Sequence, residues 1–198
     1  RGAAVVCVAA NVVLDRNPAV EYVDVETAQQ LARACDERFG DCDLLLMAAA
    51  VADYRPAAAA DTKIKKDAAS LELALERTGD VLSGLAARRR EGQTLVGFAA
   101  EHGDDGAATE AARGKLERKG VDAVVLNDIS RPDIGFDAAD NEVTIVTAAG
   151  ERKVPRASKG EVAAAILDVI QDLLIRDGYN SEDGAPGAPG AAGPRRAG

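Results

Sequence analysis

The sequence predicts an α/β fold with a doubly wound, mostly parallel sheet and a C-terminal antiparallel hairpin. Strand-like apolar runs alternate with helical segments through most of the chain, which is the pattern of a parallel sheet. The run at residues 44–48 is apolar at every position, as is typical of a strand buried on both faces. Late in the chain, two strand candidates flank a turn at residues 148–150 and indicate the hairpin.

The first half of the chain contains several strand candidates and one clear helix. Strands are expected at residues 3–9, 20–25 and 44–48. Thr27 and Gln30 have the spacing of a capping box, so they predict a helix that begins after Thr27 and ends at Gly40. The period-two spacing of leucines at residues 71–75 predicts a half-exposed strand or extended segment.

The second half continues the alternation. Helices are expected at residues 80–90 and 107–119, and strands at residues 95–99, 123–126, 141–147 and 153–155. Ser158 and Glu161 form a second capping box that opens the last helix. One apolar stripe of that helix should face the core or a partner, through Val162, Ile166, Val169, Ile170 and Leu173. These elements together predict a Rossmann-like sheet.

Composition limits the function classes. One folded domain is expected over residues 1–178, followed by a disordered Gly/Pro/Ala tail over 179–198 that has too few apolar residues to fold. The net charge of −9 argues against nonspecific nucleic-acid or membrane-surface binding, and no apolar window is long enough to span a membrane. Cys7, Cys35 and Cys42 form no CxxC pair and indicate reduced thiols in the cytoplasm. His102 is the only histidine, which excludes a multi-histidine zinc site.

A local cluster of positive charge stands out in this acidic chain. Lys63, Lys65 and Lys66 fall within four positions, after small residues that follow the strand at 44–48 and after the carboxylate of Asp53. Small residues let a ligand approach the backbone, and lysines meet phosphates as mobile charges. The segment therefore predicts a nucleotide site beside a flexible flap, although a solvated surface run is the alternative.

Three strand ends carry polar or small residues, at 49–53, 98–101 and 127–128. Because ligands of doubly wound sheets bind beyond the carboxyl ends of strands, we expect these loops to share one rim. The sequence contains no GxGxxG, Walker A or HExxH motif, which argues against nicotinamide binding and P-loop chemistry.

Several candidate residues also have a structural interpretation. Lys115 and Lys119 share a helix face, where two like charges lower helix stability by ~0.2–0.5 kcal/mol unless an anion binds between them. The alternative is structural: positive side chains are favoured near the C-terminus of a helix. Asp53 is either a turn former or an acceptor for ribose hydroxyls or nucleotide-bound Mg²⁺. Phe98 packs in the core or stacks on a base.

Five segments in register resemble one family. They are AAAVADYRP with KIKK, LVGFAAE, KLERKG, LNDIS and IGFDAADNEVTIV. This series is similar to phosphopantothenoylcysteine synthetase (phosphopantothenate–cysteine ligase), the C-terminal half of the bifunctional bacterial coenzyme A biosynthesis flavoprotein. The resemblance covers residues 2–175.

The resemblance implies roles for individual residues. Lys63 would contact the nucleotide and support catalysis, Lys115 and Lys119 would bind the nucleotide, and Asp53 would bind ribose or Mg²⁺. The segment Thr78, Gly79, Asp80, Val81 would also contact the nucleotide, although Gly79 stands where relatives have proline. The cytosine would be read by Ala49, Ala50, Val51 and Phe98.

The implied reaction joins 4′-phosphopantothenate to cysteine with CTP and Mg²⁺, through an acyl-cytidylate. The implied enzyme is a cytoplasmic homodimer, and FMN is expected only in the decarboxylase half, which lies outside the resemblance. A non-catalytic partner or regulatory subunit of the same fold is the main alternative, and a nucleotide-sugar or dinucleotide enzyme is a third.

Two departures from the family pattern concern the N-terminal part of the sheet. Ala10 and Asn11 stand where relatives usually have Gly-Pro, and the relatives' glycine-containing loop and asparagine would precede residue 1. We expect the sheet to lack its first strand–helix unit and to expose apolar groups around Val5, Val6 and Val8. The 198-residue chain alone is therefore expected to associate and to lack ligase turnover.

Overall fold

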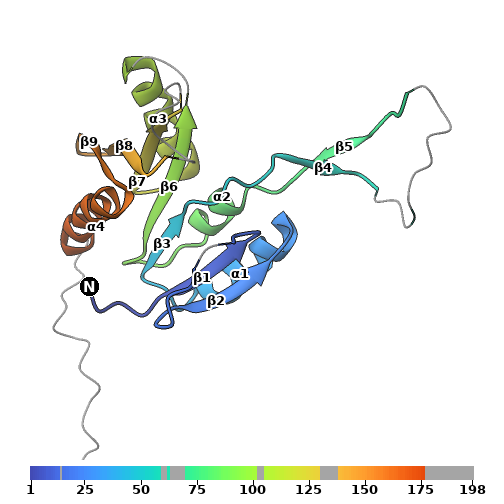
Figure 1. The fold of residues 1–198 in the computed structure, drawn as a ribbon, viewed down its shortest axis with the longest axis horizontal. Helices are drawn as coiled ribbons and strands as arrows, with labels where there is room; N and C mark the ends of the chain where they lie inside the picture. The colour runs from blue at the N-terminus through green and yellow to red at the C-terminus, as the bar shows by residue number, and fades with distance from the viewer. Residues whose placement is uncertain (14, 59–61, 63–69, 102–104, 130–137, 177–198) are drawn as a thin grey trace, which may run out of the picture.

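The computed structural model describes residues 1–13, 15–58, 62, 70–101, 105–129 and 138–176. Its strands fall into three groups (Figure 1). The main sheet has the order β3 (Leu44–Met47), β6 (Thr94–Glu101), β7 (Ala123–Asp128), β8 (Asp140–Thr147) and β9 (Gly150–Ser158). A parallel pair consists of β1 (Val6–Ala10) and β2 (Glu21–Val25), and an antiparallel pair of β4 (Tyr54–Pro56) and β5 (Leu75–Arg77).

The main sheet confirms the predicted fold class. Strands β3, β6 and β7 are parallel neighbours, with Met47 opposite Gly97 and Ala99 opposite Leu126. Strands β8 and β9 then add in antiparallel order as the expected hairpin. Gly150 closes its turn with a φ of 137°, a conformation that residues with a Cβ rarely adopt.

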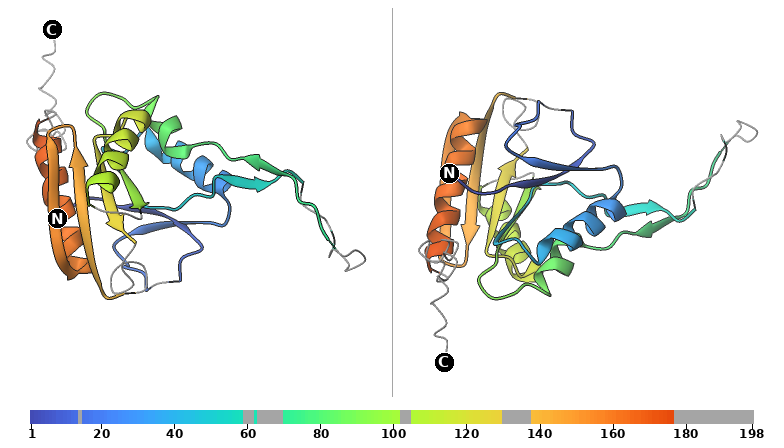
Figure 2. Two further views of the ribbon diagram at one scale, coloured as in Figure 1. Left: turned by 90° about the horizontal axis from the view of Figure 1, so that it is seen from above. Right: turned by 90° about the horizontal axis from the view of Figure 1, so that it is seen from below.

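Helices cover both faces of the main sheet, so the sheet is doubly wound. Helices α1 (Ala28–Phe39), α2 (Val81–Ala86) and α3 (Asp105–Lys119) contribute to one apolar cluster with alternate residues of β6 and β7, such as Leu95 and Val124. Helix α4 (Lys159–Arg176) packs on the opposite face against Val96 and Val125. Figure 2 shows α4 and α3 on opposite sides of the strands.

Local sequence signals explain where the helices begin and end. Thr27 Oγ1 accepts from the backbone N–H of Gln30, whose side chain accepts from the backbone N–H of Thr27. The box at Ser158 and Glu161 forms in the same way before α4. Gly120 ends α3 with a φ of 64°. Both predicted capping boxes are therefore confirmed.

Some expected elements differ in detail from those observed. Helix α2 ends at Ala86 rather than Arg90: the N–H groups of Arg88 and Arg89 bond three residues back, and the N–H of Arg90 donates to the side chain of Gln93 instead of continuing the helix. The leucines at 71, 73 and 75 are all exposed, and only Leu75 lies in a strand. Strands β4 and β5 lead away from the rest of the fold (Figure 1), so no core is available to bury one side of them.

The pair β1–β2 stands apart from the main sheet. Among the described residues, the pair is not hydrogen-bonded to β3, although residues of β1, β2 and β3 pack in the same apolar cluster beside α1. Val5 and Val6 are 47% and 42% exposed, which agrees with the expected apolar surface, whereas Val8 is half-buried. Among the described helices, none is long and apolar enough to cross a membrane.

Candidate functional site

The predicted rim exists at the carboxyl edge of the main sheet. Because β3, β6 and β7 are adjacent and parallel, the residues after Met47, Ala99 and Leu126 reach the same edge. At this edge Asn127 accepts a hydrogen bond from the side-chain amide of Asn141 at 3.0 Å. The strand ends that the sequence singled out are thus neighbours in space.

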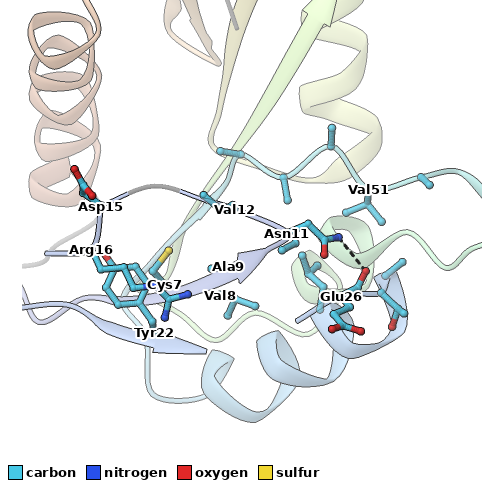
Figure 3. A pocket seen from close by; sticks show the side chains of 18 residues that line it. Cys7, Val8, Ala9, Asn11, Val12, Asp15, Arg16, Tyr22, Glu26 and Val51 are labelled. Carbon is cyan, nitrogen blue, oxygen red and sulfur yellow. Dashed lines mark hydrogen bonds between the residues drawn. The ribbon is translucent and has the colours of Figure 1, made fainter. Parts of the chain in front are cut away.

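A cavity of about 720 Å³ opens where residues 48–52 leave β3 (Figure 3). The opposite wall comes from the carboxyl end of β1 and the beginning of α1. Ala49, Ala50 and Val51 line this cavity, and the N–H of Val51 donates to the carbonyl of Ala49 at 3.2 Å. The small side chains leave the backbone accessible to a ligand, as the sequence predicted for this turn.

Asn11 shapes the same cavity and was noted in the sequence only as a departure from the family pattern. Its φ is 53°, and its side-chain amide donates to the carbonyl of Glu26 at 3.2 Å (Figure 3). Asparagine tolerates this left-handed conformation better than most residues do. The bond ties the end of β1 to the start of α1 and keeps the cavity wall in place.

Thr78 links the turn that follows β3, at residues 48–53, to the segment predicted to contact the nucleotide, at residues 78–81. Its N–H donates to the carbonyl of Asp53 at 2.9 Å, and its hydroxyl donates to the carbonyl of Ala52. The Asp53 side chain is exposed. The segment of Thr78, Gly79, Asp80 and Val81 therefore lies directly beside the turn that follows β3.

Asp80 begins α2 and contacts a lysine from another element. Its Oδ1 accepts from the backbone N–H of Ser83 at 3.1 Å, so Asp80 caps the helix. Its Oδ2 accepts from Lys119 Nζ at 2.7 Å and from Ser83 Oγ at 2.8 Å. Burial alone would raise the pKa of the Asp80 carboxyl, but the hydrogen bonds from Lys119 and Ser83 lower it below its ordinary value.

Lys115 lies one turn before Lys119 on α3, as the spacing predicted. Its Nζ donates to the carbonyl of Phe98 at 3.2 Å. Partial burial, with a smaller contribution from the charge of Lys119, lowers the pKa of Lys115 below the ordinary lysine value. The two ammonium groups thus form a partly desolvated positive region between α2, α3 and β6.

Phe98 contributes its backbone carbonyl to this positive region, whereas its phenyl ring lies on the other face of the sheet. The half-buried ring packs with the apolar cluster beneath α4, on the face of the sheet opposite to the cluster that includes Leu116 of α3. The phenyl ring and the two lysines therefore lie on different sides of β6, and base stacking by Phe98 stays a prediction.

Other predicted residues lie outside the described part of the chain. These are Lys63, Lys65, Lys66 and His102. Among the described residues no group of three or more Asp, Glu, His or Cys side chains gathers as a metal site. Mg²⁺ in nucleotide sites is bound by one or two carboxylates together with phosphate oxygens, so the exposed carboxylate of Asp53 fits a nucleotide-borne ion rather than a protein cage.

Sequence reasoning missed the partners that hold the site together. Ser83 fixes the Asp80 carboxylate, and Asn141 orients Asn127. The Asp80–Ser83 spacing is a helix-cap signal that was available in the sequence. The Asp80–Lys119 contact joins residues 39 positions apart and leaves no local signal.

Comparisons with known proteins find the family that the sequence segments resemble. The family model of the DNA/pantothenate metabolism flavoprotein C-terminal domain matches residues 1–174. The coenzyme A biosynthesis bifunctional protein CoaBC of Mycolicibacterium smegmatis is 40% identical over 193 residues, which are 93% of this chain and 45% of that protein. A cysteine/cysteine sulfinic acid decarboxylase from an unknown prokaryotic organism is 36% identical over 156 residues, covering 78% of this chain and 43% of that protein.

A solved structure supports the fold. The crystal structure of the C-terminal domain of CoaBC matches with a TM-score of 0.71 and 32% identity, covering 88% of this chain and 76% of that chain. The present chain spans less than half of the length of the curated relatives it matches.

Proposed function

Since the chain belongs to the DNA/pantothenate metabolism flavoprotein C-terminal domain family, we propose that it carries the ligase activity that joins 4′-phosphopantothenate to cysteine with CTP. The relatives named CoaBC act in coenzyme A biosynthesis, and their C-terminal half is the part that matches. The proposal assigns to this chain the synthetase reaction and not the FMN-dependent decarboxylation. We expect it to act in the cytoplasm.

One observation carries the proposal: a continuous series of contacts joins the predicted nucleotide residues. Ala52 and Asp53 bind Thr78, and Asp80 follows two residues later and binds Lys119. Lys115, one turn away on α3, binds the backbone of Phe98. These contacts therefore link a small-residue turn to two ammonium groups, a combination that suits the phosphates of a nucleoside triphosphate.

In the first proposed step, a carboxylate oxygen of 4′-phosphopantothenate attacks the α-phosphorus of CTP. A new P–O bond forms, the bond to the β-phosphate bridging oxygen breaks, and pyrophosphate leaves with that electron pair. Negative charge concentrates on the phosphates, so Lys63, Lys115 and Lys119 would stabilise the transition state. Mg²⁺ held by the phosphates and Asp53 would supply further positive charge.

In the second proposed step, the amine of cysteine attacks the acyl carbon of the acyl-cytidylate. The C–N bond forms, CMP leaves, and the amine loses a proton to solvent or to the leaving phosphate. Neither step needs a nucleophile from the protein. This agrees with Cys35 and Cys42, because burial raises the pKa of both thiols and keeps them protonated at neutral pH.

We further propose that two copies form a homodimer through the segment around β4 and β5. Among the described residues of this segment, Tyr54, Leu71, Leu73 and Leu75 have exposed apolar side chains. A projecting pair of strands with exposed leucines lacks a core within its own chain, and a second copy would bury it.

The test is pyrophosphate release by the complete gene product, with CTP and 4′-phosphopantothenate, with and without cysteine. The proposal predicts release that requires both substrates, and formation of phosphopantothenoylcysteine only when cysteine is added. Binding of CTP with no pyrophosphate release by the complete product would favour a non-catalytic partner subunit instead.

A further inference from the structure

Lys115 and Lys119 supply the two ammonium groups proposed to bind phosphates, and Lys119 is already paired with the carboxylate of Asp80. Lys119 Nζ lies 2.7 Å from Asp80 Oδ2, and the Lys119 side chain is only 20% exposed. A carboxylate and a phosphate oxygen accept hydrogen bonds from the same ammonium hydrogens. Both groups therefore compete for Lys119.

We propose that Asp80 is an internal counter-ion, which holds Lys119 in position while the site is empty and from which Lys119 turns away to an entering polyphosphate. This inference rests on the proposed nucleotide site and adds a positioning role for Asp80. In this role Asp80 weakens anion binding. An Asp80 side chain that contacted the nucleotide directly would strengthen it.

The contacts of Asp80 determine which partner moves. Its carboxylate accepts two hydrogen bonds from Ser83, one from the backbone N–H and one from the hydroxyl, at the first turn of α2. Lys119 is at the end of α3 and has a four-carbon side chain, so its ammonium group can turn toward a ligand without any change in either helix. Asp80 stays in place, and Lys119 exchanges acceptors.

The surrounding charges explain why a counter-ion is needed here. Lys115 lies one turn away, and Arg118 and Glu101 also act on it electrostatically. Two lysines on one helix face repel each other, most strongly where solvent is partly excluded. Asp80 offsets this repulsion in the empty protein, but it also repels an approaching phosphate.

The competing explanation is that Asp80 only caps α2. Asparagine and aspartate cap helices about equally well, so Asp80→Asn keeps the bond to the N–H of Ser83 and removes the charge. If capping is the whole role, Asp80→Asn leaves anion binding unchanged. If Asp80 is a counter-ion, the variant binds polyphosphate more tightly.

The experiment measures binding of inorganic triphosphate by calorimetry, at low salt and without divalent ions, on the 198-residue chain. Asp36→Asn is the matched control, because Asp36, on α1, forms an exposed ion pair with Arg88 and the change removes the same charge. We expect Asp80→Asn to lower the dissociation constant about two- to fivefold, the range for a partly exposed ion pair, and Asp36→Asn to leave it unchanged. In the Lys119→Met background the gain from Asp80→Asn should shrink to the part that comes from direct repulsion between Asp80 and the phosphate.

Three results would overturn the counter-ion role: equal or weaker binding by Asp80→Asn, the same gain in Asp36→Asn, or no triphosphate binding by any variant. Asp80→Ser, which also caps helices, serves as a second variant if Asp80→Asn unfolds. A failure of the proposed function is seen separately. In that case triphosphate binding responds as expected, but CTP is not preferred over other nucleotides.

Discussion

Lys115 donates a hydrogen bond from its Nζ to the carbonyl oxygen of Phe98, over 3.2 Å. This bond joins α3 to the strand at the centre of the parallel part of the sheet, and it places an ammonium group beside the carboxyl edge. A neutral carbonyl leaves the full charge of Lys115 available to an anion, whereas Lys119 is paired with Asp80. The two lysines thus differ in how much of their charge a ligand meets.

The pKa of Lys115 leads to a prediction about stability and pH. Since burial and the charge of Lys119 lower this pKa in the folded state, the unfolded chain binds more protons than the folded one between the lowered pKa and the ordinary lysine value. The contribution of Lys115 to the free energy of unfolding therefore rises with pH across that window. Lys115→Met should flatten this alkaline rise in urea unfolding curves. The control Arg33→Met, at an exposed position of α1, should keep it.

Close packing between α2 and β6 predicts the effect of a single methyl group. A Cβ at Gly97 would lie 3.0 Å from Leu82 Cδ2, so Gly97→Ala should lower the free energy of unfolding by ~1–3 kcal/mol. A Cβ at Gly84, in α2, meets no atom within 4 Å, and Gly84→Ala should stabilise by ~0.4–1 kcal/mol. Chemical denaturation of both variants measures the difference. Equal effects would show that Leu82 and its neighbours adjust without cost.

Lys63 is the residue on which the proposed first step depends most. In the complete gene product, Lys63→Ala should slow pyrophosphate release from CTP and 4′-phosphopantothenate by an amount equivalent to ~2.7–4 kcal/mol in the barrier, by analogy with loss of one oxyanion donor. The same change should leave the unfolding midpoint unaltered, because the sequence around Lys63 has no apolar periodicity. Thr62→Ala, at an exposed neighbour, is the control. An unchanged rate of release in Lys63→Ala would remove Lys63 from the mechanism.

The C-terminal tail is predicted to be dispensable. A chain shortened after Asn180 should keep its thermal midpoint and its nucleotide binding, since the removed Gly/Pro/Ala sequence has little apolar surface to bury. A chain shortened after Asp168 should unfold, because it loses Ile170 and Leu173, both buried against the sheet. Loss of binding in the first chain would mean that the tail contributes to the site.

Local patterns predicted most of the elements, and contacts distant in sequence account for what they missed. The boxes at Thr27 and Ser158 depend on neighbours within four residues, so the sequence displays them. The apolar run of β3 marks a strand in the same way, but its predicted burial on both faces is wrong, because β3 is the edge strand of the main sheet and Leu46 is 42% exposed. The separation of β1–β2 from the main sheet depends on pairing between remote strands, which no local pattern encodes.

The same distinction holds at the site. Parallel strand order placed the carboxyl ends on one rim, and helical spacing placed Lys115 beside Lys119. The side on which the Phe98 ring lies could not be predicted, since both faces of β6 are apolar and alternation does not tell one face from the other. The contact of Lys119 with Asp80 required the fold to bring α2 and α3 together.

The central claim is that this sheet edge binds CTP, and the most direct measurement is the thermal midpoint of the complete gene product with CTP, ATP, GTP or NADPH at equal concentrations. The account predicts the largest upward shift with CTP, a smaller shift with ATP and GTP through their phosphates, and little with NADPH. Equal stabilisation by ATP or NADPH would contradict the assignment of this site to a cytidine nucleotide.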